Sequence, residues 1–332
     1  MKASFRTSRV FKFAACALLL SLLIAACTSA APATDAPTVP PTDVPTQPPT
    51  EPPTAPPTAP PTEPPLPSKP LSGLDANPQR VEFQAEDGKK LVGYYYPSKY
   101  ADAPIVILIH WAGGDLTDWC KVAPWLQNRA DENPSEPERC ANAGADLPAG
   151  VPTPWLDPSW FPAMNPEASL AVFAFDLRDY GESEAGGAGP NWAKDAKAAF
   201  ATAAGLEGVD AGRMASIGAS IGADGAADGC LLYNQEAGGG CVGALSLSPG
   251  NYLGMKYSTV VADLAPVLVW CLAAENDGES APTCRSASGE HYRSQIYPGN
   301  PHGMLLIAPD FDPLPMALIQ EFLELVFGEI VK

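Results

Sequence analysis

Short apolar runs and amphipathic segments alternate along the chain after residue 80. Residues 81–97 predict two antiparallel strands that turn at Asp87-Gly88. Further strand patterns, bounded by Gly, Pro or Asp, lie within 104–114, 169–181, 213–220, 242–250, 265–277 and 292–300. Helical patterns lie at 118–129, 193–205, 221–235 and 314–330. Strands that alternate with helices predict the α/β class, with a mostly parallel central sheet covered by helices on both faces.

The first residues follow a different pattern. Basic residues precede an apolar run at 13–26, which is too short to span a bilayer but fits an export signal. The tetrapeptide Ile24-Ala25-Ala26-Cys27 resembles the lipobox of bacterial lipoproteins, in which the signal is cut before a cysteine that then carries lipid. This resemblance implies a signal peptide at 1–26 and a lipoprotein anchored to a membrane through Cys27, facing the periplasm or the cell exterior. Ordinary cleavage nearby, giving a soluble secreted protein, is the alternative.

A segment rich in Pro and Thr follows the signal. Between residues 32 and 70 the chain carries 17 of its 38 prolines, many of them in PPTE and PPTA repeats. Such a sequence cannot build a core and extends as polyproline II at about 3.1 Å per residue. We therefore expect 27–75 to be the lipidated cysteine and a linker, and 76–332 to be one globular domain.

The chain is acidic, with a formal net charge of −18. Four of its 20 basic residues lie in the predicted signal, so the exported chain would have 16 basic residues against 38 acidic ones. Phosphate backbones repel such a chain, so nucleic acid is not an expected partner.

Six cysteines remain once the signal is removed and Cys27 is lipidated. An even number in an exported chain suggests disulfides, and neighbours along the sequence would pair as Cys120 with Cys140, Cys230 with Cys241, and Cys271 with Cys284. Zinc is the rival explanation, but no CxxC or CxxH spacing supports it.

The segment 128–166 is longer than an ordinary connection and shows no hydrophobic period. It is either a functional flap or a surface excursion fixed by Cys140, and we expect a structured loop that borders the site. Trp155 and Trp160 in it could line a substrate groove.

Ser220 is the candidate nucleophile. It lies at the centre of Gly218-Ala219-Ser220-Ile221-Gly222, between an apolar strand pattern and an alanine-rich helix pattern. Glycines two residues before and after a serine leave room for a strained turn from strand to helix, which projects the hydroxyl toward a substrate.

The base and the acid must come from loops at the same edge of the sheet. Of three histidines, His110 precedes the serine and His291 precedes its strand, whereas His302 follows the last strand and is favoured as the base. Asp277, at the end of the preceding strand, is favoured as the acid that orients His302, with Glu275 as its rival. The order Ser, Asp, His is the one expected for such a sheet.

From about residue 81 to its end the chain resembles the α/β-hydrolases. The GxSxG elbow, the order of the three residues and Asp176-Leu177-Arg178-Asp179-Tyr180-Gly181-Glu182-Ser183 carry this resemblance, and the absence of a large cap between 246–251 and 265–270 makes the chain similar to the dienelactone-hydrolase-like and esterase branches. The resemblance implies an oxyanion hole made by the backbone N–H groups of Ile221 and Ala112, with Trp111 as the alternative to Ala112. In this chain Trp111 stands where the family usually has Gly.

These residues predict a serine hydrolase that acts on carboxylic esters or related acyl substrates and needs no cofactor and no metal. A peptidase or thioesterase could use the same triad, and a binding module could keep the fold without activity. The segment 238–243 satisfies GxGxxG, but it follows a helix and leads into a strand, so it predicts a turn rather than a dinucleotide site.

Overall fold

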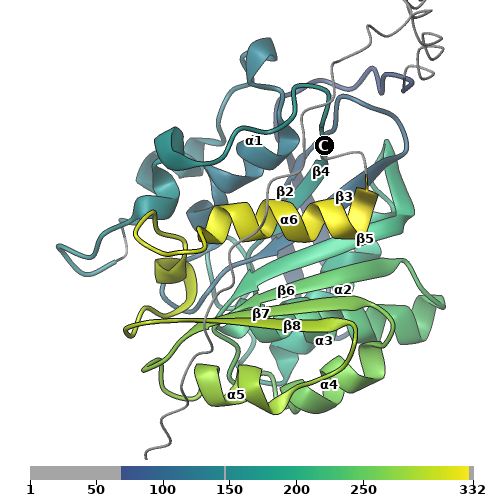
Figure 1. The fold of residues 1–332 in the computed structure, drawn as a ribbon. Helices are drawn as coiled ribbons and strands as arrows, with labels where there is room; N and C mark the ends of the chain where they lie inside the picture. The colour runs from purple at the N-terminus through teal and green to yellow at the C-terminus, as the bar shows by residue number, and fades with distance from the viewer. Residues whose placement is uncertain (1–68, 146, 329–332) are drawn as a thin grey trace, which may run out of the picture. The chain divides into compact units, whose positions relative to one another are not determined.

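The computed structural model describes residues 69–145 and 147–328 (Figure 1). The predicted signal, Cys27 and the Pro/Thr-rich linker up to residue 68 lie outside the described residues. No helix in the described ranges is both long and apolar enough to cross a membrane.

Eight strands form one sheet in the order β1-β2-β4-β3-β5-β6-β7-β8. The first two pairings, β1 with β2 and β2 with β4, are antiparallel, and the other five are parallel. The predicted hairpin and all six further predicted strands are present. The strands are β1 (Gln79–Gln84), β2 (Lys90–Tyr96), β3 (Ala103–Ile109), β4 (Ala171–Phe175), β5 (Val209–Ala219), β6 (Cys241–Leu247), β7 (Leu268–Ala274) and β8 (Tyr292–Tyr297).

Helices cover both faces of the sheet, as predicted. The α-helices are α1 (Val122–Gln127), α2 (Asn191–Ala204), α3 (Ile221–Ala237), α4 (Tyr257–Leu264), α5 (Ser280–Ser286) and α6 (Pro315–Phe327). Side chains alternate along β3, so that Ile105 and Ile107 belong to the core cluster shared with α2, α3 and α4, while Val106 and Leu108 belong to the core cluster shared with α1 and α6. Figure 1 shows α6 crossing one face of the sheet and α3, α4 and α5 on the other. Burial on both faces explains why these strands are apolar throughout.

The helix predicted over 118–129 differs in the structure. It is a 3₁₀-helix at Leu116–Trp119 followed by the shorter α1. Asp115 caps the start of the 3₁₀-helix, because its side chain accepts the N–H of Thr117, and Asn128 caps the end of α1 in the left-handed region at φ 53°. Two short helices, α4 and α5, escaped the pattern analysis because both are too brief to show a clear helical period.

Three disulfides link Cys120 to Cys140, Cys230 to Cys241, and Cys271 to Cys284. The predicted pairing is confirmed. Three disulfides are compatible with a location outside the cytoplasm, because reducing compartments keep thiols free.

The long segment 128–166 is ordered where the structure describes it, and it contains four short 3₁₀-helices. Asn128 closes its base by donating from its side-chain amide to the carbonyls of Asn165 and Ala168, at 2.9 and 2.7 Å. Cys140 ties its middle to Cys120, so the expectation of a fixed excursion is met.

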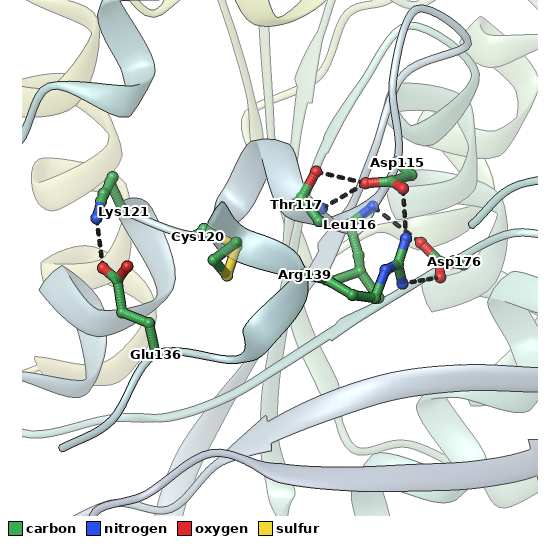
Figure 2. The surroundings of a disulfide bond; sticks show 9 residues. Asp115, Leu116, Thr117, Cys120, Lys121, Glu136, Arg139 and Asp176 are labelled. Carbon is green, nitrogen blue, oxygen red and sulfur yellow. Dashed lines mark hydrogen bonds and ion pairs between the residues drawn. A yellow bond between two sulfur atoms is a disulfide. The ribbon is translucent and has the colours of Figure 1, made fainter. Parts of the chain in front are cut away.

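The disulfide also places a cation between the loop after β3 and the loop after β4. Figure 2 shows Arg139, the residue before Cys140, between Asp115 after β3 and Asp176 after β4. Its Nη1 donates to Asp176 Oδ2 at 2.6 Å, while Asp176 Oδ1 accepts the N–H of Leu116 at 3.0 Å. Asp176 is fully buried, and burial raises its pKa although His110 and Arg139 oppose that rise. Arg139 therefore compensates a carboxylate that water cannot reach.

Removal of Arg139 tests this arrangement. We expect Arg139→Ala to lower the free energy of unfolding by about 3 kcal/mol, because it strands the buried charge of Asp176. Lys121→Ala is the matched control, since Lys121 pairs with Glu136 in the same region but both side chains are partly exposed, at 32% and 47%; it should cost less than about 1 kcal/mol. Urea denaturation measures both, and equal losses would contradict the role given to Arg139.

Candidate active site

Three predicted residues meet at the edge of the sheet where the parallel strands end. Ser220 follows β5, Asp277 follows β7 and His302 follows β8. His302 Nε2 lies 2.7 Å from Ser220 Oγ, and its Nδ1 lies 2.8 Å from Asp277 Oδ1. The three side chains thus form one continuous hydrogen-bonded chain, with the geometry that proton transfer from the hydroxyl requires.

Ser220 stands on the strained turn that its flanking glycines predict. Its backbone has φ 54° and ψ −117°, which L-residues rarely adopt. A Cβ on Gly218 would lie 1.8 Å from the Gly222 carbonyl oxygen, and a Cβ on Gly222 would lie 2.3 and 2.4 Å from the carbonyl oxygens of Ile109 and His110. Both glycines are therefore required for α3 to start this close to the ends of β3 and β5.

Asp277 is buried at 8% exposure, and it is held by a rigid turn. The bond between Cys271 in β7 and Cys284 in α5 brackets the turn, as the sequence suggested. The rival acid, Glu275, is exposed to solvent, and its backbone N–H bonds to the next strand. Asp277, not Glu275, contacts His302.

The charge of Asp277 is favoured at this position. Burial acts to raise its pKa, but hydrogen bonding from His302 and Ser248 outweighs burial and lowers the pKa below its usual value. An ionised Asp277 accepts the Nδ1–H of His302 and leaves Nε2 free to accept the Ser220 proton. Ser248 also anchors the loop of His302, because its hydroxyl accepts the N–H of Gly303 at 3.0 Å.

The other two histidines lie away from Ser220. His291 is at the start of β8, where its Nε2 contacts the Val261 carbonyl at 2.8 Å. His110 is fully buried after β3, and its Nε2 accepts the N–H of Leu177 at 3.0 Å. Its Nδ1 must then carry the proton and donate to the Trp111 carbonyl at 2.7 Å. Burial lowers the pKa of His110, which favours this neutral form.

His110 gives the loop after β3 a fixed peptide orientation that sequence analysis missed. The carbonyl of Trp111 and the N–H of Ala112 belong to one planar trans peptide, so they point in opposite directions. With the carbonyl held by His110, the Ala112 N–H faces away from His110, and Ala112 itself is exposed. Ile221 opens α3, where the first N–H groups have no acceptor within the helix. The N–H groups of Ala112 and Ile221, the two predicted donors, are thus not taken up by hydrogen bonds within the sheet or within α3.

The Trp111 side chain is fixed behind this loop. Its Nε1 donates to Asp118 Oδ2 at 2.7 Å, and its ring meets that of Trp155 edge to face at 5.9 Å. Trp155 is completely buried, so the suggestion that it lines a substrate groove is wrong. Instead it joins the long segment to the loop after β3, and a Cβ on Gly303 would lie 2.9 Å from the Trp111 ring.

No group of three or more His, Cys, Asp or Glu side chains within the described ranges could hold a metal ion. Residues 238–240 form the turn between α3 and β6, which confirms the interpretation of that glycine run.

Two buried carboxylates lie below the nucleophile on α3. Asp224 and Asp228 are one helical turn apart, and each is 1% exposed. Asp224 accepts the N–H groups of Gly250 and Tyr252. Burial raises the pKa of Asp224 to about 6. Burial and the neighbouring Asp224 raise the pKa of Asp228 to about 8, and Asp228 Oδ2 has no hydrogen-bond partner among the residues described.

The close approach at Gly222 predicts a sharp difference between two glycines of α3. Gly222→Ala should destabilise the fold by about 1–3 kcal/mol, because the new methyl group meets backbone that must move. Gly225→Ala should be neutral or stabilising by up to about 1 kcal/mol, because its Cβ would make ordinary contacts at 3.5 Å and alanine favours helix. Thermal unfolding of both variants measures this, and a Gly222→Ala as stable as Gly225→Ala would contradict the packing.

Asp228 predicts a pH-dependent stability. Its pKa is higher in the folded state than the usual value near 3.9, so between about pH 4 and 8 the folded state binds more protons and the free energy of unfolding falls as pH rises. Asp228→Asn has no proton to lose. The variant should therefore gain stability relative to the wild type from pH 5 to 8, by at most about 1.4 kcal/mol per pH unit. The exposed Asp131→Asn is the control, and parallel Tm curves for Asp228→Asn and wild type would refute the prediction.

Comparison with known proteins gives the fold a name. No protein-family model matches the chain, and no curated protein does. Among solved structures, the α/β-hydrolase GrgF from Penicillium sp. sh18 is similar at a TM-score of 0.50 and 12% identity, over 76% of this chain and 99% of that one. The 2,6-dihydroxy-pseudo-oxynicotine hydrolase is similar at a TM-score of 0.50 and 11% identity, over 77% of this chain and 70% of that one. Residues 248–267 between β6 and β7 hold only the short α4, so there is no large cap there. The chain has the α/β-hydrolase fold.

Proposed function

We propose that this protein is a serine hydrolase that cleaves carboxylic esters through an acyl-enzyme. The observation that carries the proposal is the hydrogen-bonded chain from Ser220 through His302 to Asp277, with contacts of 2.7 and 2.8 Å. A serine hydroxyl attacks a carbonyl only when a base removes its proton, and a neutral imidazole held by an ionised carboxylate supplies that base.

In the first half of the reaction, Ser220 Oγ forms a bond to the carbonyl carbon while His302 Nε2 takes the hydroxyl proton. The carbonyl oxygen becomes an oxyanion, which the N–H groups of Ile221 and Ala112 would stabilise. A single donor of this kind is typically worth about 10² to 10³ in turnover. His302 then gives its proton to the alcohol oxygen, the bond from carbon to that oxygen breaks, and the acyl group stays on Ser220.

In the second half, water replaces the alcohol. His302 takes a proton from the water as the water oxygen attacks the acyl carbon, and the same two N–H groups hold the second oxyanion. The proton returns to Ser220 Oγ when the ester bond to the enzyme breaks, which releases the carboxylic acid. No residue is consumed in this cycle.

The disulfides bear on where the protein works. Three disulfides are compatible with work outside the cytoplasm. The lipid anchor on Cys27 and the likeness to the dienelactone-hydrolase-like branch stay predictions from the sequence. A thioester or peptide substrate would use the same steps with a thiol or an amine as leaving group, and a binding module would use none of them.

A fluorophosphonate probe tests the proposal, because it reacts covalently with an activated serine. We expect labelling of the wild type and of Ser286→Ala, which removes an exposed serine, and no labelling of Ser220→Ala. Hydrolysis of p-nitrophenyl esters should fall by on the order of 10⁴ or more in Ser220→Ala.

Comparison with thioesters and peptide anilides separates the substrate classes. If thioesters or peptide anilides are cleaved faster than esters, the protein is a thioesterase or a peptidase and not an esterase. An unlabelled wild type that cleaves none of them would support the binding module.

A further inference from the structure

Tyr252 stands beside the triad on the loop that follows β6. Its ring meets the His302 ring edge to face, with the ring centres 6.4 Å apart and the planes at 83°. Among the described residues, the exposed large apolar side chains are Leu71 at 67%, Tyr252 at 36% and Leu325 at 62%. Tyr252 is the one that contacts His302, so part of an aromatic side chain is open to solvent next to the reacting atoms.

Contacts within its own loop and with α3 hold Tyr252 in place. The buried carboxylate of Asp224 accepts the N–H of Tyr252 and, at 3.2 Å, the N–H of Gly250. A Cβ on Gly250 would lie 2.2 Å from the Tyr252 ring, so the ring folds back over its own loop and packs closely on Gly250. The Asn251 side chain accepts the N–H of Tyr257 at 2.7 Å, which joins the loop to the start of α4. The exposure of Tyr252 is therefore built in and is not that of a free loop tip.

The chemistry decides which part of an ester reaches Tyr252. The carbonyl oxygen must face Ile221 and Ala112, where the oxyanion donors lie. The leaving oxygen must face His302 Nε2, because that atom protonates it. The alcohol group, attached to the leaving oxygen, then extends on the His302 side, where Tyr252 stands.

We propose that Tyr252 forms the apolar wall of the subsite for the alcohol group, that Asp224 positions this wall, and that the preferred substrates are esters of alcohols with a flat apolar group. The inference rests on the proposed esterase function and deepens it. A flat group that stacks against an aromatic ring gains about 0.5–1.5 kcal/mol beyond simple burial, which is about 2- to 13-fold in kcat/KM.

The test uses two ester series and compares each variant with the wild type on the same ester, so that intrinsic reactivity cancels. Methyl, benzyl and naphthylmethyl acetates vary the alcohol, and benzyl acetate, butyrate and hexanoate vary the acyl group. Tyr252→Ala should lower kcat/KM about 10-fold for the benzyl and naphthylmethyl acetates and less than about 2-fold for methyl acetate. Across the acyl series the loss should be constant.

Three further variants distinguish the effect of the Tyr252 ring from a general loss of activity. Tyr252→Phe keeps the ring and should keep the preference for benzyl over methyl acetate. Asp224→Asn should lose that preference as Tyr252→Ala does, and the double variant should lose no more than Tyr252→Ala alone, because both act through one wall. Leu325→Ala removes an exposed apolar side chain from α6 and is the control. Its kcat/KM should match that of the wild type on every ester.

Each outcome has a distinct meaning. Equal losses for methyl and benzyl acetate, or losses that follow the acyl length, would overturn the alcohol subsite and leave the esterase standing. Retained preference in Asp224→Asn would overturn the positioning role of Asp224 alone. The absence of any hydrolysis that depends on Ser220 would overturn the esterase and the subsite together.

Discussion

The site depends on one close approach, in which the start of α3 lies against the ends of β3 and β5. The register pairs Ile109 with Gly218, so the two strands end side by side. A Cβ on Gly222 would lie 2.3 Å from the Ile109 carbonyl oxygen, so the helix can start this close only with glycine at that position. This contact holds Ser220 in a backbone conformation that costs of order 1–3 kcal/mol in isolation. The rest of the sheet, with its core on both faces, supplies the stability that this strain consumes.

Around Ser220, buried polar side chains fix the positions of the loops that follow β3 and β4. His110 joins the loop after β3 to the loop after β4, and Asp176 with Arg139 joins the same two loops from the other side. Each link is internally satisfied, which is how buried polar groups avoid a large desolvation cost. The loop that carries the Ala112 N–H is thereby fixed at both of its ends, which is the preorganisation that the proposed oxyanion donor requires.

Two of the three disulfides stabilise loops around Ser220. One brackets the turn of Asp277, and another holds Arg139 against Asp176. Such bonds limit local opening where short helices and turns bury too little apolar surface to be stable alone. The loop of Tyr252 has no disulfide among the described residues and relies on the Asp224 carboxylate instead.

The sequence by itself predicted the strand pattern, the class of the fold, Ser220 and His302, and it favoured Asp277 over Glu275 and disulfides between neighbouring cysteines. These follow from local signals, since apolar runs, Gly-x-Ser-x-Gly and the positions of residues after strands are read along the chain. Only the tertiary structure decided that Trp155 is core rather than groove, that His110 anchors the Trp111 carbonyl, and that Asp224 holds Tyr252 over His302. Those contacts join residues from different loops, and no periodic pattern specifies which buried donor meets which acceptor, because that choice is made by packing.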